Sequence, residues 1–287
     1  MEFSILGSGG CTVIPKPLCR CRVCTEARLK GFPFERGGPA AFLHDENILI
    51  DTPAEISRQL NRSDIHEICC LMLTHLDPDH IEGFRVVEQM TIDFRTWEAF
   101  PGKTLPLVLP HQLLENFRNV RTAYGSWVSF YEKSGFLRCE PFDRQTVIGE
   151  IQVTALPVNR GDQIAYIYVF EKNGGKVVYA PCDIKPFPEH DPAVQRPDVL
   201  FIQPGMFETG LKGGFVYPAD HVSRETLYTF DQTVALSRRI QAQKVVFIHL
   251  EEYWNRSYTD YCALEAGCDH MVFACDGMQF TIKERER

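Results

Sequence analysis

The sequence has no long apolar run, no long basic tract and no segment of low complexity. No stretch approaches the roughly 18 apolar residues that a membrane-spanning helix requires, so we expect no membrane association. The 30 lysine and arginine residues are outnumbered by 38 aspartate and glutamate residues, which gives a net charge of −8. Because nucleic-acid backbones are bound by cationic surfaces, this balance argues against a polynucleotide substrate and leaves a small phosphate ester open.

The amino-terminal residues lack the basic and apolar pattern of a secretory signal. Residues 1–6 instead have the pattern of a β-strand. The 11 cysteines are odd in number and scattered, unlike the framework of a disulfide-rich secreted protein. We therefore expect a cytoplasmic protein. The sequence does not indicate an oligomeric state.

Length and composition fit a single α/β domain. The chain has 287 residues, 44% of them hydrophobic, so a large core is available and disorder is not expected. Strand-rich patterns occupy residues 1–73 and resume near Ile151. We expect one domain over residues 1–287, with a less interpretable insert around 91–142.

The most informative segment runs from Thr74 to His80 and follows an apolar stretch that predicts a strand. A helix-like pattern comes after it. In an extended loop, positions i and i+2 point the same way, so His75 and Asp77 can share one metal. Asp79 and His80 stand where the chain turns into the helix and can face a second metal. A metal site explains this segment better than a solvated loop, because further candidate ligands follow later strands.

Three later apolar runs also end in polar side chains, at residues 151–156, 176–180 and 244–248. The side chains that follow them are Asn159 with Arg160, Asp183 and His249. Residues just past the carboxyl ends of buried strands are where α/β sheets place their sites. One such residue is usually a turn or capping group, but several in this order favour a site.

The order of these residues resembles that of the metallo-β-lactamase superfamily, whose members carry H-x-H-x-D-H, then a His, a bridging Asp and a final His. The resemblance covers most of the chain and implies an αββα sandwich of the α/β class, with the metals at one edge. The residues on its ligand positions are His75 and Asp77 for the first metal, Asp79, His80 and His249 for the second, and Asp183 for the bridge.

Two residues depart from that pattern. Asp77 stands where the second His is usual, and Arg160 stands where the next His is expected. A guanidinium cannot ligate a metal, because it stays protonated and has no free lone pair. We therefore predict an impaired first site and one firmly bound metal, held by the second-metal ligands together with Asp183. Arg160 is expected near Asp77 and Asp183, where it would replace part of the missing cation's charge.

The ligand types leave three metals open for the catalytic site. A carboxylate at Asp77 resembles the flavodiiron branch of the superfamily and makes the site harder, which suits iron or manganese better than zinc. The candidates are therefore Zn²⁺, Mn²⁺ and Fe²⁺.

A second cluster, Cys19, Cys21 and Cys24, has the spacing C-x-C-x-x-C. Three thiols this close are typical of a structural Zn²⁺ site, and the alternative is a reactive pair formed by two of them. The cluster resembles that of the PhnP-like cyclic phosphodiesterases and of the PqqB-like proteins. In the PhnP-like proteins the fourth ligand is a His three residues after the last catalytic-metal His. Here that position is Glu252.

His221 lies just before a long amphipathic segment. In the PhnP-like enzymes a His at the matching place contacts the phosphate and serves as proton donor to the leaving group. An imidazole, with an ordinary pKa of about 6.5, suits such acid–base work. The alternative is a surface histidine in a loop before a helix.

Three functions fit these features. The first is a metal-dependent hydrolase of a small phosphodiester, in which the metal would activate water. Asp79 would orient that water, His221 would serve the leaving group and Arg160 would bind the phosphate. The second is a PqqB-like iron-dependent oxygenase, since two His and carboxylates resemble a non-haem iron site. The third is a non-catalytic binding protein on the same fold. We expect the first, with a small-molecule substrate.

Overall fold

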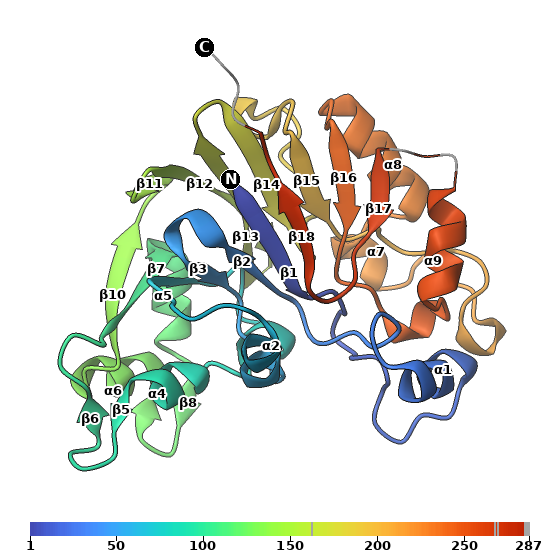
Figure 1. Cartoon of the computed structure of the whole chain (residues 1–287). Helices are drawn as coiled ribbons and strands as arrows, with labels where there is room; N and C mark the ends of the chain where they lie inside the picture. The colour runs from blue at the N-terminus through green and yellow to red at the C-terminus, as the bar shows by residue number, and fades with distance from the viewer. Residues whose placement is uncertain (162, 267, 269, 284–287) are drawn as a thin grey trace.

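The computed structural model describes residues 1–161, 163–266, 268 and 270–283. Two seven-stranded mixed sheets pack against each other with helices outside them, the sandwich predicted from the sequence (Figure 1). The first sheet has the strand order β10-β7-β4-β3-β2-β1-β18. The second has the order β11-β12-β13-β14-β15-β16-β17.

The elements have the following bounds. The first sheet consists of β1 (Glu2–Gly7), β2 (Ala40–Leu43), β3 (Ile48–Ile50), β4 (Cys70–Met72), β7 (Leu105–Pro110), β10 (Leu137–Phe142) and β18 (Met278–Thr281). The second consists of β11 (Gln145–Ile148), β12 (Ile151–Arg160), β13 (Gln163–Lys172), β14 (Gly175–Ala180), β15 (Val199–Ile202), β16 (Lys244–Phe247) and β17 (Met271–Phe273). Two short hairpins are formed by β5 (Ile92–Asp93) with β6 (Glu98–Ala99), and by β8 (Arg121–Thr122) with β9 (Gly125–Ser126).

The α-helices are α1 (Arg22–Lys30), α2 (Ile56–Arg62), α3 (Pro78–Ile81), α4 (Val86–Thr91), α5 (His111–Phe117), α6 (Trp127–Lys133), α7 (Ser223–Thr226), α8 (Phe230–Arg239) and α9 (Tyr258–Glu265). Short 3₁₀ turns are η1 (His44–Glu46), η2 (Pro192–Val194), η3 (Lys212–Gly214) and η4 (Glu252–Trp254). Over the residues that the structure describes, no helix combines the length and apolar character needed to cross a membrane.

Strand β13 shows why the second sheet is covered on both faces. Tyr166, Tyr168 and Phe170 belong to the core shared with the first sheet, whereas Ile167 and Val169 belong to the core beneath the outer helices. Successive side chains of a strand point to opposite faces, so consecutive apolar residues require a cover on each side. Helices α8 and α9 provide the outer cover, at the right of Figure 1.

The carboxyl ends of several strands meet at one edge of the sandwich. β14, β15 and β16 run parallel, with Ala180, Ile202 and Phe247 aligned at their ends. The Tyr166 N–H donates to the Thr74 carbonyl at 2.8 Å and so joins the segment after β4 to the second sheet. The polar residues that follow these strands are thereby brought together, as α/β sheets do at their sites.

The strand predicted at 151–156 is longer in the structure, because β12 continues through Pro157 to Arg160. β11 pairs with β12 only as far as Thr154, whereas β13 pairs along its whole length. Beyond Thr154 no strand among the described residues pairs with the other edge of β12, so a proline costs no ladder hydrogen bond there. Arg160 is therefore positioned by a strand rather than by a loop.

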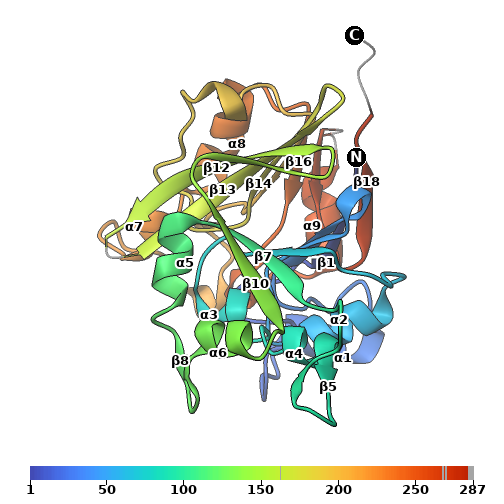
Figure 2. The same ribbon diagram turned by 90° about the vertical axis from the view of Figure 1, so that its left-hand side faces the viewer.

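The region around 91–142, expected as an insert, contributes two strands to the first sheet. β7 and β10 pair in parallel and extend the sheet beyond β4, as Figure 2 shows. Among the aromatic side chains of this region, Tyr131 is buried and Trp127 and Phe130 are half-buried. Trp97 and Tyr124 are exposed.

Candidate metal centre

A buried carboxylate, Asp51, holds the segment that follows β4. Its Oδ1 accepts the N–H of Thr74 at 2.7 Å, and its Oδ2 lies 2.9 Å from Nδ1 of His80. A carboxylate can only accept, so Nδ1 carries a hydrogen, and it is Nε2 of His80 that would present a lone pair to a metal once its own proton has left. Carboxylates behind metal-ligating imidazoles have this orienting role.

Three side chains, Asp79, His80 and His249, form what we call the second-metal group. His80 Nε2 and His249 Nε2 are 3.3 Å apart, and Asp79 Oδ2 lies 3.5 Å from the first and 3.2 Å from the second. Nitrogen and oxygen ligands on one tetrahedral zinc ion are about 3.4 Å apart, so these atoms fit a single metal. Nδ1 of His249 lies 3.3 Å from Oε1 of Glu251 and 3.1 Å from Nε2 of Gln203, and these two side chains hold the ring.

His75, Asp77 and Asp183 form a further group, which we call the first-metal group. The guanidinium of Arg160 lies against it, with Nη2 2.7 Å from Asp183 Oδ2 and Nη1 3.4 Å from Asp77 Oδ2. This is the proximity that the sequence predicted for Arg160. A fixed positive charge between two carboxylates stands in for part of a cation's charge.

The expected bridging role of Asp183 is not what the geometry favours. Its carboxylate pairs with Arg160, and among the described residues it groups with His75 and Asp77 rather than with the second-metal group. Thr226 of α7 also hydrogen bonds to it. Asp183 is thus held on the first-metal side.

Cys182 is a candidate ligand that the sequence pattern did not predict. It is buried, and its Sγ lies 3.4 Å from Nε2 of His75 and 3.5 Å from Nε2 of His80. With His75 and His80 it forms a third possible ligand group among the described residues. The signal was its place beside Asp183, just after β14, where a strand end already carried one candidate ligand.

The charges of the centre set its protonation states. Burial, reinforced by the nearby His80, lowers the pKa of His75 well below its ordinary value. Burial also opposes protonation of His80, but the Asp51 carboxylate outweighs it and raises the pKa of that imidazole well above its ordinary value. Burial opposes ionisation of Asp79, yet the hydrogen bond with His249 lowers the pKa of this carboxyl below its usual range. His75 is therefore neutral and Asp79 ionised, as metal ligation requires, and a bound cation would replace the proton of His80.

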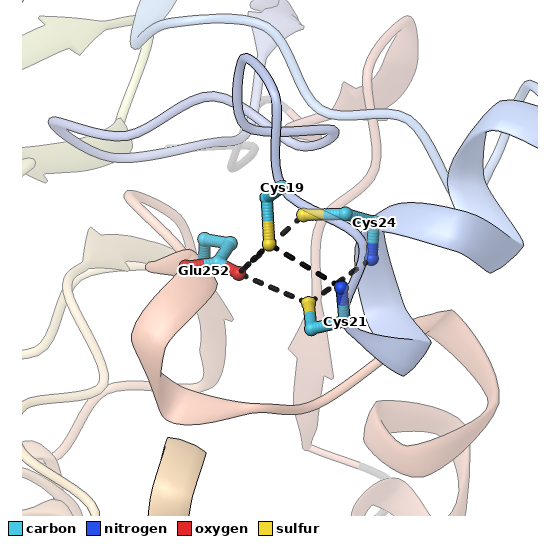
Figure 3. A group of neighbouring side chains, drawn as sticks. All are labelled: Cys19, Cys21, Cys24 and Glu252. Carbon is cyan, nitrogen blue, oxygen red and sulfur yellow. Dashed lines mark hydrogen bonds between the residues drawn. The ribbon is translucent and has the colours of Figure 1, made fainter.

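Cys19, Cys21, Cys24 and Glu252 converge in what we call the cysteine cluster (Figure 3). The three sulfur atoms lie 3.5, 3.1 and 3.4 Å from Glu252 Oε1. Sulfur and oxygen ligands on one tetrahedral zinc ion are about 3.5 Å apart, so the side chains fit that ion. The structure thus brings Glu252 to the place that the sequence indicated for the fourth ligand.

Lys212 of η3 is a further member of this region. Its Nζ contacts Oε1 of Glu252 and lies 3.1 Å from Sγ of Cys19. The backbone N–H of Cys21 and then the ammonium of Lys212 lower the pKa of the Cys19 thiol. Three thiolates and a carboxylate exceed the charge of one Zn²⁺ by two, and the lysine offsets part of that excess.

His221 lies in the loop before α7. Its Nδ1 accepts the N–H of Ser223 at 3.2 Å, and its ring packs on Tyr217 with 4.9 Å between centroids. Since Nδ1 accepts, Nε2 carries the proton of the neutral ring. No contact between His221 and either metal group is seen in the described part of the chain. The hydrogen bond between Thr226 and Asp183 nevertheless joins α7 to the centre.

Comparisons with known proteins show the family and the fold. Residues 46–250 match the family model described as the beta-lactamase superfamily domain. The fold is similar to a diphosphatase of the PhnP family, with 18% identity, a TM-score of 0.71 and coverage of 97% of this chain and 96% of that one. The fold is also similar to that of Zn²⁺-bound PqqB from Methylobacterium extorquens, with 16% identity, a TM-score of 0.75 and coverage of 98% of this chain and 100% of that one. The short form of human tRNase Z has 14% identity and a TM-score of 0.63, with coverage of 99% of this chain and 100% of that one. No curated protein matches the sequence significantly.

Proposed function

Because the chain belongs to the metallo-β-lactamase superfamily, we propose that it is a metal-dependent hydrolase of a small phosphodiester. One observation carries the proposal. The three ligand atoms of the second-metal group are spaced for one metal, and a guanidinium is fixed at the neighbouring first-metal group. A metal beside a phosphate-binding cation is what the hydrolysis of a phosphate ester needs.

The side chains would divide the work as follows. A bound divalent metal would supply hydroxide near neutral pH by lowering the pKa of water. Asp79 would hold the metal and orient that water. Arg160 has N–H groups beyond those directed at its two carboxylates, and phosphate oxygens would accept from them. His221, with its ring in the imidazolium form, would donate the Nε2 proton to the leaving oxygen and become the neutral imidazole.

We further propose one firmly bound Zn²⁺, Mn²⁺ or Fe²⁺ at the second-metal group and a structural Zn²⁺ in the cysteine cluster. The interatomic distances of both sets support this assignment. Arg160 supports a single metal, because its positive charge lies between the carboxylates that would hold another.

An iron-dependent oxygenase is the second candidate, and one observation favours it. Two imidazoles and one carboxylate make up the second-metal group. That set is the facial triad of non-haem iron oxygenases, and PqqB is among the similar folds.

Metal analysis combined with turnover separates the two candidates. The protein is purified without added metal, its metal content is measured, and hydrolysis of bis(p-nitrophenyl) phosphate is followed. We expect zinc or manganese together with hydrolysis that Asp79→Asn abolishes. Iron with oxygen consumption and no hydrolysis would favour the oxygenase. A second-metal group that stays empty under every loading would leave a non-catalytic binding protein.

We also propose a single domain that works in the cytoplasm on a small molecule. The pairing of β1 with β18 at the two ends of the chain supports one domain. The eleven cysteines are all free thiols, which suits a reducing compartment. The net charge of −8 supports a small substrate over the RNA implied by the name of the tRNase Z relative.

A further inference from the structure

Three apolar side chains are exposed on the loop that carries His221. Phe215, Val216 and Val222 are 47%, 67% and 68% exposed. Phe215 lies against the imidazole of His221, with 6.0 Å between the ring centroids and 69° between the ring planes. Apolar side chains gathered beside a polar functional group are typical of a ligand-binding site.

The loop is held in shape by Arg224. Its guanidinium donates to the carbonyl oxygens of Tyr217 at 3.2 Å and Pro218 at 2.8 Å, and it pairs with Glu208 at 2.7 Å. The carbonyl of His221 in turn accepts the N–H of Arg224 at 2.9 Å. A surface that is ordered before binding loses less conformational entropy when a ligand arrives, so this loop is suited to recognition.

The same loop is attached to the metal centre. The side chain of Thr226, at the end of α7, hydrogen bonds to Asp183 of the first-metal group. The carbonyl of Thr226 also accepts the N–H of Lys185, two residues beyond Asp183, at 3.3 Å. The loop therefore borders the centre, and a leaving group that receives a proton from His221 comes within reach of Phe215.

We propose that Phe215 is a specificity-determining residue that selects phosphodiesters whose leaving group carries an aromatic ring. The proposal rests on the proposed function, because it takes His221 as the proton donor to that group. Aromatic rings prefer offset or edge-to-face pairs with centroids about 4.5–7 Å apart, and Phe215 already pairs edge-to-face with His221 and Tyr217. An aromatic ring of the substrate would extend this cluster and remove the exposed part of Phe215 from water.

Two phosphonates test the proposal without relying on turnover. Phenylphosphonate and methylphosphonate present the same charged group and differ in the aromatic ring. Their dissociation constants for the zinc-loaded protein are measured by isothermal titration calorimetry. We expect the wild type to bind phenylphosphonate about tenfold more tightly than methylphosphonate, the effect of one well-placed aromatic pair. In Phe215→Ala the ratio of the two dissociation constants should fall to about one, because the partner ring is gone.

Two further variants serve as controls. Phe215→Tyr keeps the ring and should keep the preference for phenylphosphonate. Phe94→Ala removes an aromatic side chain that is 73% exposed on the turn between β5 and β6, and should bind both phosphonates as the wild type does. Substitutions of exposed side chains seldom disturb folding, and the wild-type preference is a test that needs no variant. Equal affinity of the wild type for the two phosphonates, or a preference that survives in Phe215→Ala, would overturn the proposal.

The outcomes separate this inference from the proposed function. Hydrolysis of bis(p-nitrophenyl) phosphate by a wild type without aromatic preference would uphold the hydrolase and reject the role of Phe215. A preference that depends on Phe215, without any hydrolysis, would uphold the aromatic site and reject the hydrolase. Failure of both phosphonates to bind, together with absence of hydrolysis, would reject both.

Discussion

Asp51 illustrates how one residue outside the ligand set controls the centre. It is fully buried, accepts the N–H of Thr74 and orients His80. Asp51→Asn keeps the shape but weakens the acceptor behind the imidazole. We expect affinity for Zn²⁺ at the second-metal group to fall by about 10- to 100-fold, the usual effect of such a partner. Competition with a chromophoric chelator measures it.

Asp93→Asn is the control for that variant. Asp93 is also buried, 6% exposed, but it is paired with Arg95, away from the metal groups. Its substitution should leave the affinity unchanged. If Asp51→Asn binds zinc as tightly as the wild type, His80 is oriented by its surroundings and not by the carboxylate.

For His221 we predict an effect on turnover and none on metal binding. His221→Ala removes a proton donor but no ligand, so the metal should stay while turnover of the phosphodiester falls by about a hundredfold or more. Metal content and rate are measured on the same sample. Loss of the metal in this variant would make His221 a ligand, and unchanged turnover would remove it from the mechanism.

Arg160 can be tested by restoring the residue that the family pattern expects. Arg160→His should raise metal occupancy at His75 and Asp77, because it supplies an imidazole and removes the competing charge. Metal content per chain should increase over that of the wild type. Arg160→Gln, which removes the charge without supplying an imidazole, should bring a smaller increase. Equal metal content in the wild type and Arg160→His would show that the arginine does not limit the site.

The sequence predicted which residues form the metal centre better than it predicted how they are arranged. Spacing and strand ends pointed to both metal groups and to the position of Arg160 beside Asp77 and Asp183. Cys182 was missed because adjacent residues after a strand point in different directions, and no pattern says which one faces the metal. Asp183 also has a φ of +53°, a backbone conformation that sequence does not reveal.

At the scale of elements, the cysteine cluster joins the loop before α1 to η4. Cys21→Ser removes a ligand, so about one zinc per chain should be lost. A metal that binds only the folded state stabilises it by about 4 kcal/mol when its free concentration is a thousand times the dissociation constant. Elemental analysis and thermal unfolding measure the two effects.

Cys139→Ser provides the comparison, since this thiol is also half-buried and belongs to no metal group among the described residues. It should keep its zinc and most of its stability. Unchanged zinc content in Cys21→Ser would mean that the thiols do not form a zinc site.

Strands were predictable from the sequence where the apolar pattern had the length of a strand. They were less predictable where the neighbouring strands of the sheet determine how far a strand extends or with which strand it pairs. The strand before Asp183 was evident from its β-branched run. The extension of β12 through Pro157 was not, because only the absence of a strand beside that edge makes proline harmless. The paired β7 and β10 were hidden for a similar reason, since parallel partners lie far apart in sequence.

For the whole molecule, the family resemblance predicted the αββα sandwich. How the loop after β1 and the segment after β16 hold the metal centre is seen only in the structure. Glu251 joins the loop after β1 to His249: its Oε1 accepts the N–H of Cys11 at 3.1 Å and lies 3.3 Å from Nδ1 of His249. The next residue, Glu252, belongs to the cysteine cluster. The loop after β1 and the segment after β16 therefore both contribute to holding the two candidate metal sites.

This shared segment predicts that the two metal sites are coupled. Loss of zinc from the cysteine cluster in Cys21→Ser should release Glu252, disturb Glu251 and misplace His249. Coupling energies within one contact network are about 0.5–3 kcal/mol, so affinity at the second-metal group should fall by roughly tenfold although none of its ligands has changed. Linkage requires metal binding at each site of the unmodified protein to strengthen binding at the other by the same factor, so His249→Ala should also weaken zinc binding at the cluster. Metal affinities measured at each site, with the other intact or disrupted and with Cys139→Ser as control, test both directions. Unchanged affinity at the centre of Cys21→Ser would show that residues 249–252 are held by the sheet alone, through bonds such as that from the Leu250 N–H to the Ser8 carbonyl at 2.8 Å.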